Sequence, residues 1–192
     1  MRTRIAMAAA RIMAEDGIED FALAKRKAAR QLGAEETQSL PRNEEIEAEL
    51  RAYQSLYQSD EQRERIKYLR ARALEAMQAL AQFRPYLAGP VLKGTAGRYS
   101  DIDLQLFTDD SKAVEMFLLS RDIPYDISDQ RHFAGDQARA VSILKLEWQG
   151  APVNLAIYTA NDERGSLKTS VAGRPLERAG IQAVSQLLCR DG

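Results

Sequence analysis

The sequence predicts an α+β protein, with a helical N-terminal half packed with a mixed β-sheet and its flanking helices. Apolar residues recur at helical spacing through residues 1–88, which predicts helices there. From Gly89 onward they alternate with polar residues, which predicts strands. The 192 residues also suffice for two parts, a helical region over 1–88 and an α/β domain over 89–192.

Four helices are expected in the N-terminal part. The first apolar face ends at Gly17 and the second at Gly33, and glycine commonly ends a helix. Asn43 and Asp60 are candidate N-caps for two more helices. The expected ranges are about 5–16, 21–32, 44–57 and 61–82, with a polar loop at 34–43.

Strands are expected in the C-terminal part, because the apolar period there changes to two. A turn with Gly150 and Ala151 at its centre would join the last two strands as a hairpin. A short helix at 111–121 and a closing helix at 176–189 complete the pattern. The expected strands cover about 91–95, 102–107, 123–128, 140–148 and 153–159.

The composition excludes several classes of protein. The net charge is −1 and neither half is basic, so nucleic acid is not an expected partner. One cysteine, Cys189, and one histidine, His132, cannot form a Cys/His metal cluster, and we expect His132 on the surface. No apolar run reaches the roughly 18 residues of a membrane span, and Arg11 and Glu15 interrupt the apolar N-terminus. We therefore expect a cytoplasmic protein without a membrane partner.

Two aspartates at alternate positions are the main candidates for chemistry. On a strand, Asp101 and Asp103 point to one face while Ile102 and Leu104 point to the other. Neighbouring carboxylates repel each other, and a bound Mg²⁺ (or Mn²⁺), which also takes phosphate oxygens, is a usual reason to keep them together. The ordinary alternative is an edge strand with two exposed aspartates.

Residues around this pair are candidates for binding a nucleotide. Glycines before the strand let the backbone approach a phosphate, and hydroxyl or basic side chains can bind it. The candidates are Gly94, Thr95, Gly97, Arg98, Ser100, Lys93 and Asn154, with Lys145 and Lys168 as further basic candidates.

The stretch Gly89–Leu104 reads GPVLKGTAGRYSDIDL. It resembles the signature of the nucleotidyltransferases of the DNA polymerase beta superfamily, especially that of their minimal bacterial members. The resemblance implies their fold for 89–192, an NTP as substrate, and transfer of a nucleoside monophosphate to a protein or small-molecule hydroxyl. It also implies that Asp101 and Asp103 are catalytic metal ligands. Through Leu40–Glu47 and Gly89–Ala96, the whole chain resembles an uncharacterised proteobacterial family.

The glycine turn of this chain departs from the signature. By spacing, Gly89 and Pro90 stand where the family has a Gly-Ser pair, and proline offers neither a hydroxyl nor an N–H. An alignment on Gly94 and Thr95 restores the hydroxyl but leaves a short spacing before the aspartates. Both alignments stay open on the sequence.

The third carboxylate of the family is missing. Asn154 stands at that position, and an amide cannot act as a general base. With Gly150 and Ala151 as the turn, Glu147 would lie opposite Asn154 and is the third catalytic candidate, whereas a solvated glutamate is the simpler alternative. The alternative function is therefore a catalytically inactive nucleotidyltransferase-fold module that binds a nucleotide or a protein partner.

The N-terminal helices allow two further readings. Residues 11–33 resemble the opening helices of TetR-type repressors, so a DNA-binding regulator is a weaker alternative, because 34–43 is a poor recognition helix. Isolated amphipathic helices are marginal, so these must dock. We expect them on the sheet face opposite the aspartates, and a homodimer through 61–82 is the other possibility. That face comprises Ile102, Leu104, Leu106, Val153, Leu155 and Ile157.

Overall fold

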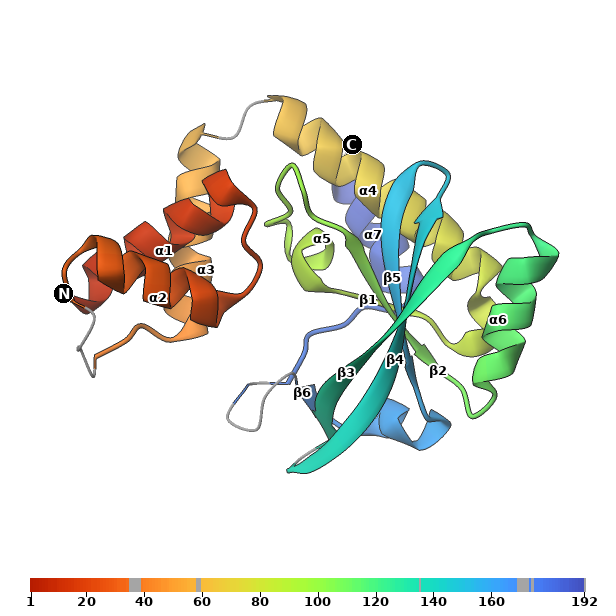
Figure 1. Cartoon of the computed structure of the whole chain (residues 1–192). Helices are drawn as coiled ribbons and strands as arrows, with labels where there is room; N and C mark the ends of the chain where they lie inside the picture. The colour runs from red at the N-terminus through yellow and green to blue at the C-terminus, as the bar shows by residue number, and fades with distance from the viewer. Residues whose placement is uncertain (35–38, 58–59, 135, 169–172, 174, 192) are drawn as a thin grey trace. The chain divides into compact units, whose positions relative to one another are not determined.

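The computed structural model describes residues 1–34, 39–57, 60–134, 136–168, 173 and 175–191, which form two compact units. The first unit comprises Met1–Arg65 with Thr95–Ser100, and the second comprises Ile66–Gly94 with Asp101–Gly192. The fold is α+β, as predicted, with helices in both units and a mixed sheet in the second (Figure 1). Whether residues 89–192 form a domain of their own stays a prediction, because a division by contacts does not test independent folding.

Three helices build most of the first unit: α1 (Arg2–Asp16), α2 (Phe21–Gln31) and α3 (Asn43–Tyr57). Gly17 ends α1 in the left-handed conformation, with a φ of 67°. Asp20 caps α2, because its side chain accepts hydrogen bonds from two N–H groups of the first turn. No helix forms at 39–42, and residues 35–38 of the predicted loop lie outside the described residues.

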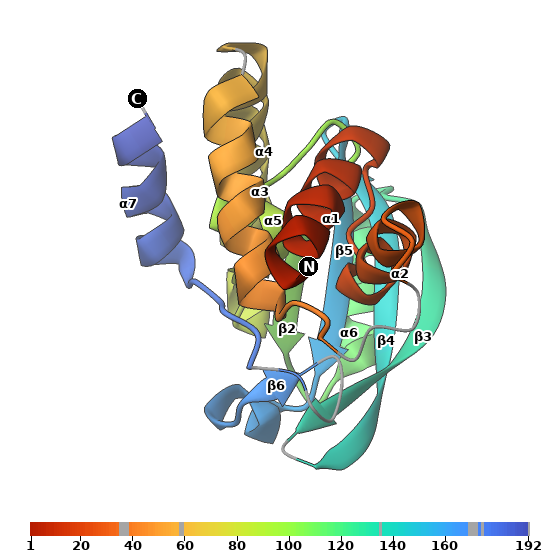
Figure 2. The ribbon, with the colours of Figure 1, turned by 90° about the vertical axis from the view of Figure 1, so that its left-hand side faces the viewer.

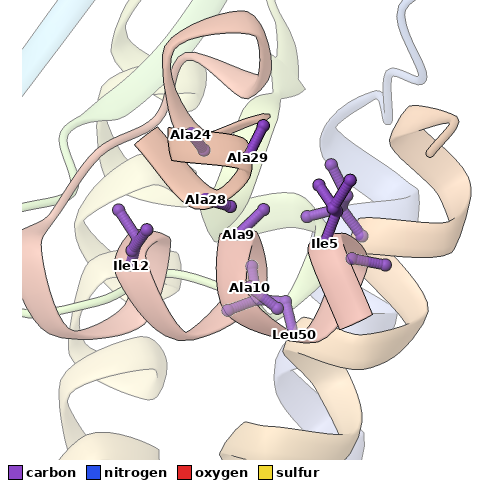
Figure 3. Packing of buried hydrophobic residues seen from close by; sticks show 10 residues of the cluster. Ile5, Ala9, Ala10, Ile12, Ala24, Ala28, Ala29 and Leu50 are labelled. Carbon is purple, nitrogen blue, oxygen red and sulfur yellow. The ribbon is translucent and has the colours of Figure 1, made fainter. Parts of the chain in front are cut away.

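Small side chains form much of the core of the first unit. Alanines from α1 and α2 pack together, and each is at most 3 % exposed (Figure 3). Alanine lets two helices approach closely, because the distance between helix axes depends on the side chains at the contact. The alanines are Ala6, Ala9, Ala10, Ala24, Ala28 and Ala29, and the larger residues Ile5, Ile12, Ile46 and Leu50 complete the cluster.

The sheet of the second unit has the strand order β1-β2-β5-β4-β3-β6. β2 and β5 run parallel, and the other neighbouring strands run antiparallel. Leu104 and Leu155 are registered partners on the face opposite the aspartates, and each is 1 % exposed. The strands are β1 (Tyr86–Ala88), β2 (Ile102–Phe107), β3 (Tyr125–Ala134), β4 (Gln137–Trp148), β5 (Ala151–Tyr158) and β6 (Leu167–Lys168).

Helices accompany this sheet on one side. The helix α4 (Asp60–Ala79) enters the second unit at Ile66, and its Leu69 and Met77 are fully buried. Figures 1 and 2 both place α4 and α7 (Ile181–Asp191) on the same side of the sheet. The remaining helices are α5 (Gly89–Lys93), α6 (Ser111–Ser120) and the short 3-10 turns η1 (Ala81–Phe83) and η2 (Ala160–Arg164). No helix in the described part of the chain is both long enough and apolar enough to cross a membrane.

The strand predicted at 91–95 is wrong. Most of these residues lie in α5, where Pro90 stands in the first turn and Gly94 ends the helix with a φ of 74°. Proline suits the start of a helix, because its φ is fixed and the N–H it lacks would have no helical partner there. The first strand is instead β1, at 86–88.

Two other element boundaries differ from the predictions. The hairpin of β3 and β4 is longer, because residues 129–134 pair with 137–142 although their apolar alternation is weak. The closing helix begins at Ile181 rather than at 176. Leu176 and Ala179 instead donate backbone hydrogen bonds to Leu167 and Leu87, as extended chain.

We predict that Ala28→Leu destabilises the protein. Ala28 is fully buried among the alanines of the first unit, so the larger side chain must displace its neighbours at a cost of about 1–3 kcal/mol. Urea unfolding followed by circular dichroism should show a lower midpoint. Ala22→Leu, on the exposed side of the same helix, is the matched control. An equal loss in both variants would contradict the packing argument.

Candidate functional site

Asp101, Asp103 and Asn154 come together in the second unit. Asp103 of β2 and Asn154 of β5 are registered partners, and Asp101 immediately precedes β2. The Asn154 Nδ2 group donates to Asp101 Oδ2 at 3.2 Å and to Asp103 Oδ1 at 3.0 Å. One amide group therefore bridges two carboxylates that share a face of the sheet, as the alternation predicts.

The backbone at Gly89 lies against the Asp103 carboxylate. Gly89 opens α5 directly after β1 and has a φ of 72°. A Cβ at this position would stand 2.5 Å from Asp103 Oδ2, a separation that real Cβ atoms essentially never show. Both the conformation and the space therefore require glycine. Of the two glycines that the sequence leaves open, Gly89 is the one beside the acidic pair, whereas Gly94 ends α5.

Burial raises the pKa of Asp103 above its ordinary value of 3.8. The hydrogen bond from Asn154 opposes this shift, and the nearby charge of Asp101 adds to it. The charged form of Asp103 is therefore costly in the folded protein. A bound cation would remove part of this cost, because it favours the ionised carboxylate.

The buried Arg70 of α4 holds α5 at its other end. Its guanidinium donates to the carbonyl oxygens of Val91 and Leu92 at 3.0 and 3.1 Å, and to the carboxylate of Asp191 at 2.7 and 2.8 Å. The last carbonyls of a helix lack helical partners, so Arg70 satisfies two of them. The sequence does not point to Arg70, because the charge-rich residues around it predict a solvated helix face.

The turn between β4 and β5 differs from the predicted one. Gln149 and Gly150 are its two central residues, with φ values of 47° and 85°. Two successive positive φ angles define the type I′ turn that suits a two-residue hairpin. The ladder therefore begins with the pair Trp148 and Ala151, one residue earlier than expected.

The prediction that Glu147 lies opposite Asn154 is consequently wrong. Lys145 is the registered partner of Asn154, and Glu147 pairs with Pro152. Glu147 is exposed and two positions away from Lys145 along β4, so it shares that face without adjoining Asn154 directly. The structure thus places a lysine, not a carboxylate, beside the amide.

The other predicted nucleotide contacts lie in different parts of the fold. Lys93 and Gly94 are at the end of α5, and Lys168 is on β6, at the opposite edge of the sheet from β1. In the first unit, the Gly97 N–H donates to Ser100 Oγ at 2.9 Å. The predicted residues of this turn are Thr95, Gly97, Arg98 and Ser100, of which Arg98 is exposed.

The prediction of a surface position for His132 is wrong. It is 8 % exposed on β3, and its Nδ1 atom lies 2.5 Å from the Tyr158 hydroxyl oxygen. Burial lowers the pKa of His132 and raises that of Tyr158, so both rings stay neutral at physiological pH. The error follows from the length of β3, because the predicted strand ends at 128.

The donors of the site suit a hard cation in part. Mg²⁺ binds one or two carboxylates and leaves other positions to water and phosphate oxygens. Asp101 and Asp103 would hold such an ion, and Asn154 could add its amide oxygen by turning its side chain. Over the described ranges of the chain, no group of three His, Cys, Asp or Glu side chains could hold a metal ion.

Comparison of the chain with known proteins finds no similar protein. No protein-family model, no curated protein and no solved structure matches the chain. The functional proposal therefore rests on the chemistry of the site.

We predict that Asp103→Asn stabilises the metal-free protein at neutral pH. Folding raises the pKa of Asp103 above 3.8. The contribution of Asp103 to the stability of the folded state is therefore fully present below pH 3.8 and is lost as the pH rises through the raised pKa. In urea unfolding, the advantage of the variant should therefore grow as the pH rises from 3.8 through the raised pKa, and then level off. The exposed Asp122→Asn is the control. A difference that does not change with pH would contradict the shifted pKa.

We predict that Asn154→Asp makes the stability of the protein depend on Mg²⁺. A third carboxylate loses the bridging donor and repels the other two, which should cost about 1–3 kcal/mol without metal. Added Mg²⁺ should restore the melting temperature of this variant more than it raises that of the wild type. Asn161→Asp, at an exposed position in η2, should show no such gain. Equal responses of the two variants to Mg²⁺ would argue against a cation site.

Proposed function

We propose that this chain is a nucleotidyltransferase-like protein that binds an NTP with Mg²⁺ (or Mn²⁺) and transfers a nucleoside monophosphate to a hydroxyl. The acceptor would be a protein or a small molecule. One observation carries the proposal: Asp101, Asp103 and the backbone of Gly89 meet where β1 passes into α5.

Each part of this junction has a chemical use. A divalent ion bound by the two carboxylates would neutralise charge on the NTP phosphates and help to align the attacking hydroxyl. Lys145 is exposed beside Asn154 and offers a positive charge to a phosphate. Asp103 is half-buried, which limits competition from water for its carboxylate.

The order of the elements also supports the proposal. The chain passes from β1 to Gly89, α5, the acidic pair on β2, and then Asn154 on the parallel strand β5. In the family that the sequence resembles, a glycine turn, two carboxylates and a third carboxylate are expected in the same order. Asn154 takes the third place, so the general base would have to come from another group or from the acceptor.

A catalytically inactive module is the second candidate function. Asn154 donates to both carboxylates, which satisfies them without a cation. An amide supplies no general base, and Pro90 supplies no hydroxyl or N–H beside Gly89. Such a module would bind a nucleotide or a protein partner without turnover.

The DNA-binding alternative receives less support. Residues 32–42 separate α2 from α3, whereas a helix-turn-helix has a turn of about three to four residues. The net charge of −1 also offers no field that would attract DNA.

Calorimetry with each nonhydrolysable NTP analogue tests the first proposal. We expect one analogue to bind with Mg²⁺, and its affinity to fall at least about tenfold with EDTA or in Asp101→Asn and Asp103→Asn. The exposed Asp122→Asn is the matched control and should bind like the wild type. Transfer from an NTP labelled at the α-phosphate to cell lysate then tests turnover.

Three outcomes separate the candidates. Metal-dependent binding with label transfer that both aspartate variants abolish supports the enzyme. Binding that is insensitive to EDTA, together with no transfer, favours the inactive module. Equal labelling by wild type and Asp103→Asn, or no binding of any analogue, contradicts the proposed activity.

A further inference from the structure

A buried amide lies one step beyond Asp103 on the face of the sheet that carries the acidic pair. Gln105 follows Asp103 by two positions on β2, so both side chains point to this face, about 7 Å apart along the strand. Gln105 is 3 % exposed, and its Oε1 atom is buried without a hydrogen-bond partner in the part of the chain that the structure describes. A buried acceptor without a donor destabilises the folded state. A ligand that supplies a donor here would remove this cost.

Arg178 reaches the same face from the extended chain beside β1. The next residue, Ala179, exchanges two backbone hydrogen bonds with Leu87, at 2.8 and 2.9 Å, which holds this chain along the outer edge of β1. The guanidinium carbon of Arg178 lies 4.7 Å from the ring centroid of Tyr86, and Tyr86 is the registered partner of Gln105. The guanidinium and the buried amide are therefore neighbours of the same tyrosine.

The contacts of Arg178 leave N–H donors for a ligand. Its guanidinium carbon also lies 4.9 Å from the ring centroid of Phe107, and contacts with rings engage the charge rather than the N–H groups. Among the described residues, its one hydrogen bond runs from Nη2 to the Glu163 carbonyl oxygen. The Glu163 carboxylate instead accepts from Arg84 and from the Tyr86 hydroxyl. A guanidinium has five N–H donors in a planar fork, so it can still bind an oxyanion.

Gly89 and Gln105 lie on opposite sides of Asp103. Ala88 is the antiparallel partner of Asp103, and Gly89, which follows Ala88, continues past Asp103 toward the start of β2. Gln105 lies toward the end of β2. The Gly89 backbone is the proposed contact of the NTP phosphates, so an acceptor is expected on the side of Gln105 and Arg178.

We propose that Gln105 and Arg178 form the acceptor subsite of the transferase, and that the acceptor is a small hydroxy acid. This proposal rests on the proposed function. Gln105 Oε1 would accept a hydrogen bond from a hydroxyl group of the ligand, and the Arg178 fork would donate to its carboxylate or phosphate group. A ligand that satisfies both residues therefore carries a hydroxyl group and an oxyanion on one molecule.

The hydroxyl group that Gln105 binds would be the nucleophile. Its oxygen forms a bond to the α-phosphorus of the NTP, the bond from this phosphorus to the oxygen that bridges to the β-phosphorus breaks, and pyrophosphate leaves. The hydroxyl proton passes to water, because a neutral amide does not take it. Gln105 and Arg178 would bind and orient the acceptor without taking part in the bonds that change.

Binding of hydroxy acids to the full chain tests the subsite. In calorimetry with and without the NTP analogue and Mg²⁺, we expect glycerate or glycerol 3-phosphate to bind, and glycerol, which has no oxyanion, not to bind. Arg178→Lys keeps the charge but loses the planar fork, so the affinity for the bound probe should fall about tenfold. Arg164→Lys, at an exposed position of η2, is the matched control. Equal affinities of Arg178→Lys and the wild type would overturn the inference.

Gln105→Met gives two readouts that a purely structural role would not give together. Methionine fills a similar volume without the buried acceptor. The ligand-free variant should unfold at a higher urea concentration than the wild type, whereas its affinity for the hydroxy acid should fall about tenfold. Gln137→Met, at an exposed position of β4, should change neither. A lower urea midpoint together with an unchanged affinity would count against the subsite.

The same measurements distinguish this inference from the proposed function. If an NTP analogue binds with Mg²⁺ and neither hydroxy acid binds, the acceptor subsite is wrong while the proposed function stands. If no analogue binds, the proposed function fails, and hydroxy-acid binding that needs both residues still supports an oxyanion subsite. If both ligands bind, label from the α-phosphate should pass to the hydroxy acid and not to glycerol.

Discussion

The parallel pairing of β2 with β5 is the constraint on which the second unit depends. A parallel pair needs a long connection, and α6, β3 and β4 supply it before β5 returns beside β2. Leu104 and Leu155 then share the buried face while Asp103 and Asn154 share the other. A slip of one residue would turn the aspartates toward the core. Core packing and the site's geometry are thus fixed by the same register.

Local patterns in the sequence predict this part of the fold well. Alternation alone gives β2 and places Asp101 and Asp103 on one face. Helical periodicity and the stop signal at Gly33 predict a helix over 21–32, and α2 covers Phe21–Gln31. These signals work because they depend on backbone geometry within a few residues.

The sequence is less informative where a distant partner or a single φ angle determines the strand register or the burial of a side chain. Because Gln149 adopts the left-handed conformation, the turn lies one residue earlier than predicted. Lys145, and not Glu147, is therefore the registered partner of Asn154. Gln54 and Arg70 are buried, and each donates to a carbonyl oxygen far along the chain, of Thr95 and Val91 respectively. Both lie in charge-rich segments for which the sequence predicts exposed helix faces. Composition and spacing do not encode such pairings, because the partners are brought together only by the fold.

The ion pair of Arg70 with Asp191 also has a consequence for biosynthesis. The two residues are 121 positions apart, and the ribosome makes the arginine first. At about 5–20 residues per second, the guanidinium waits roughly 6–24 seconds for its carboxylate. The helices α1, α2 and α3 can meet much earlier, because they are close in sequence. The Arg70–Asp191 ion pair of the second unit can therefore form only late in translation. A nascent chain that does not yet include Asp191 carries the positive charge of Arg70 without this carboxylate from α7.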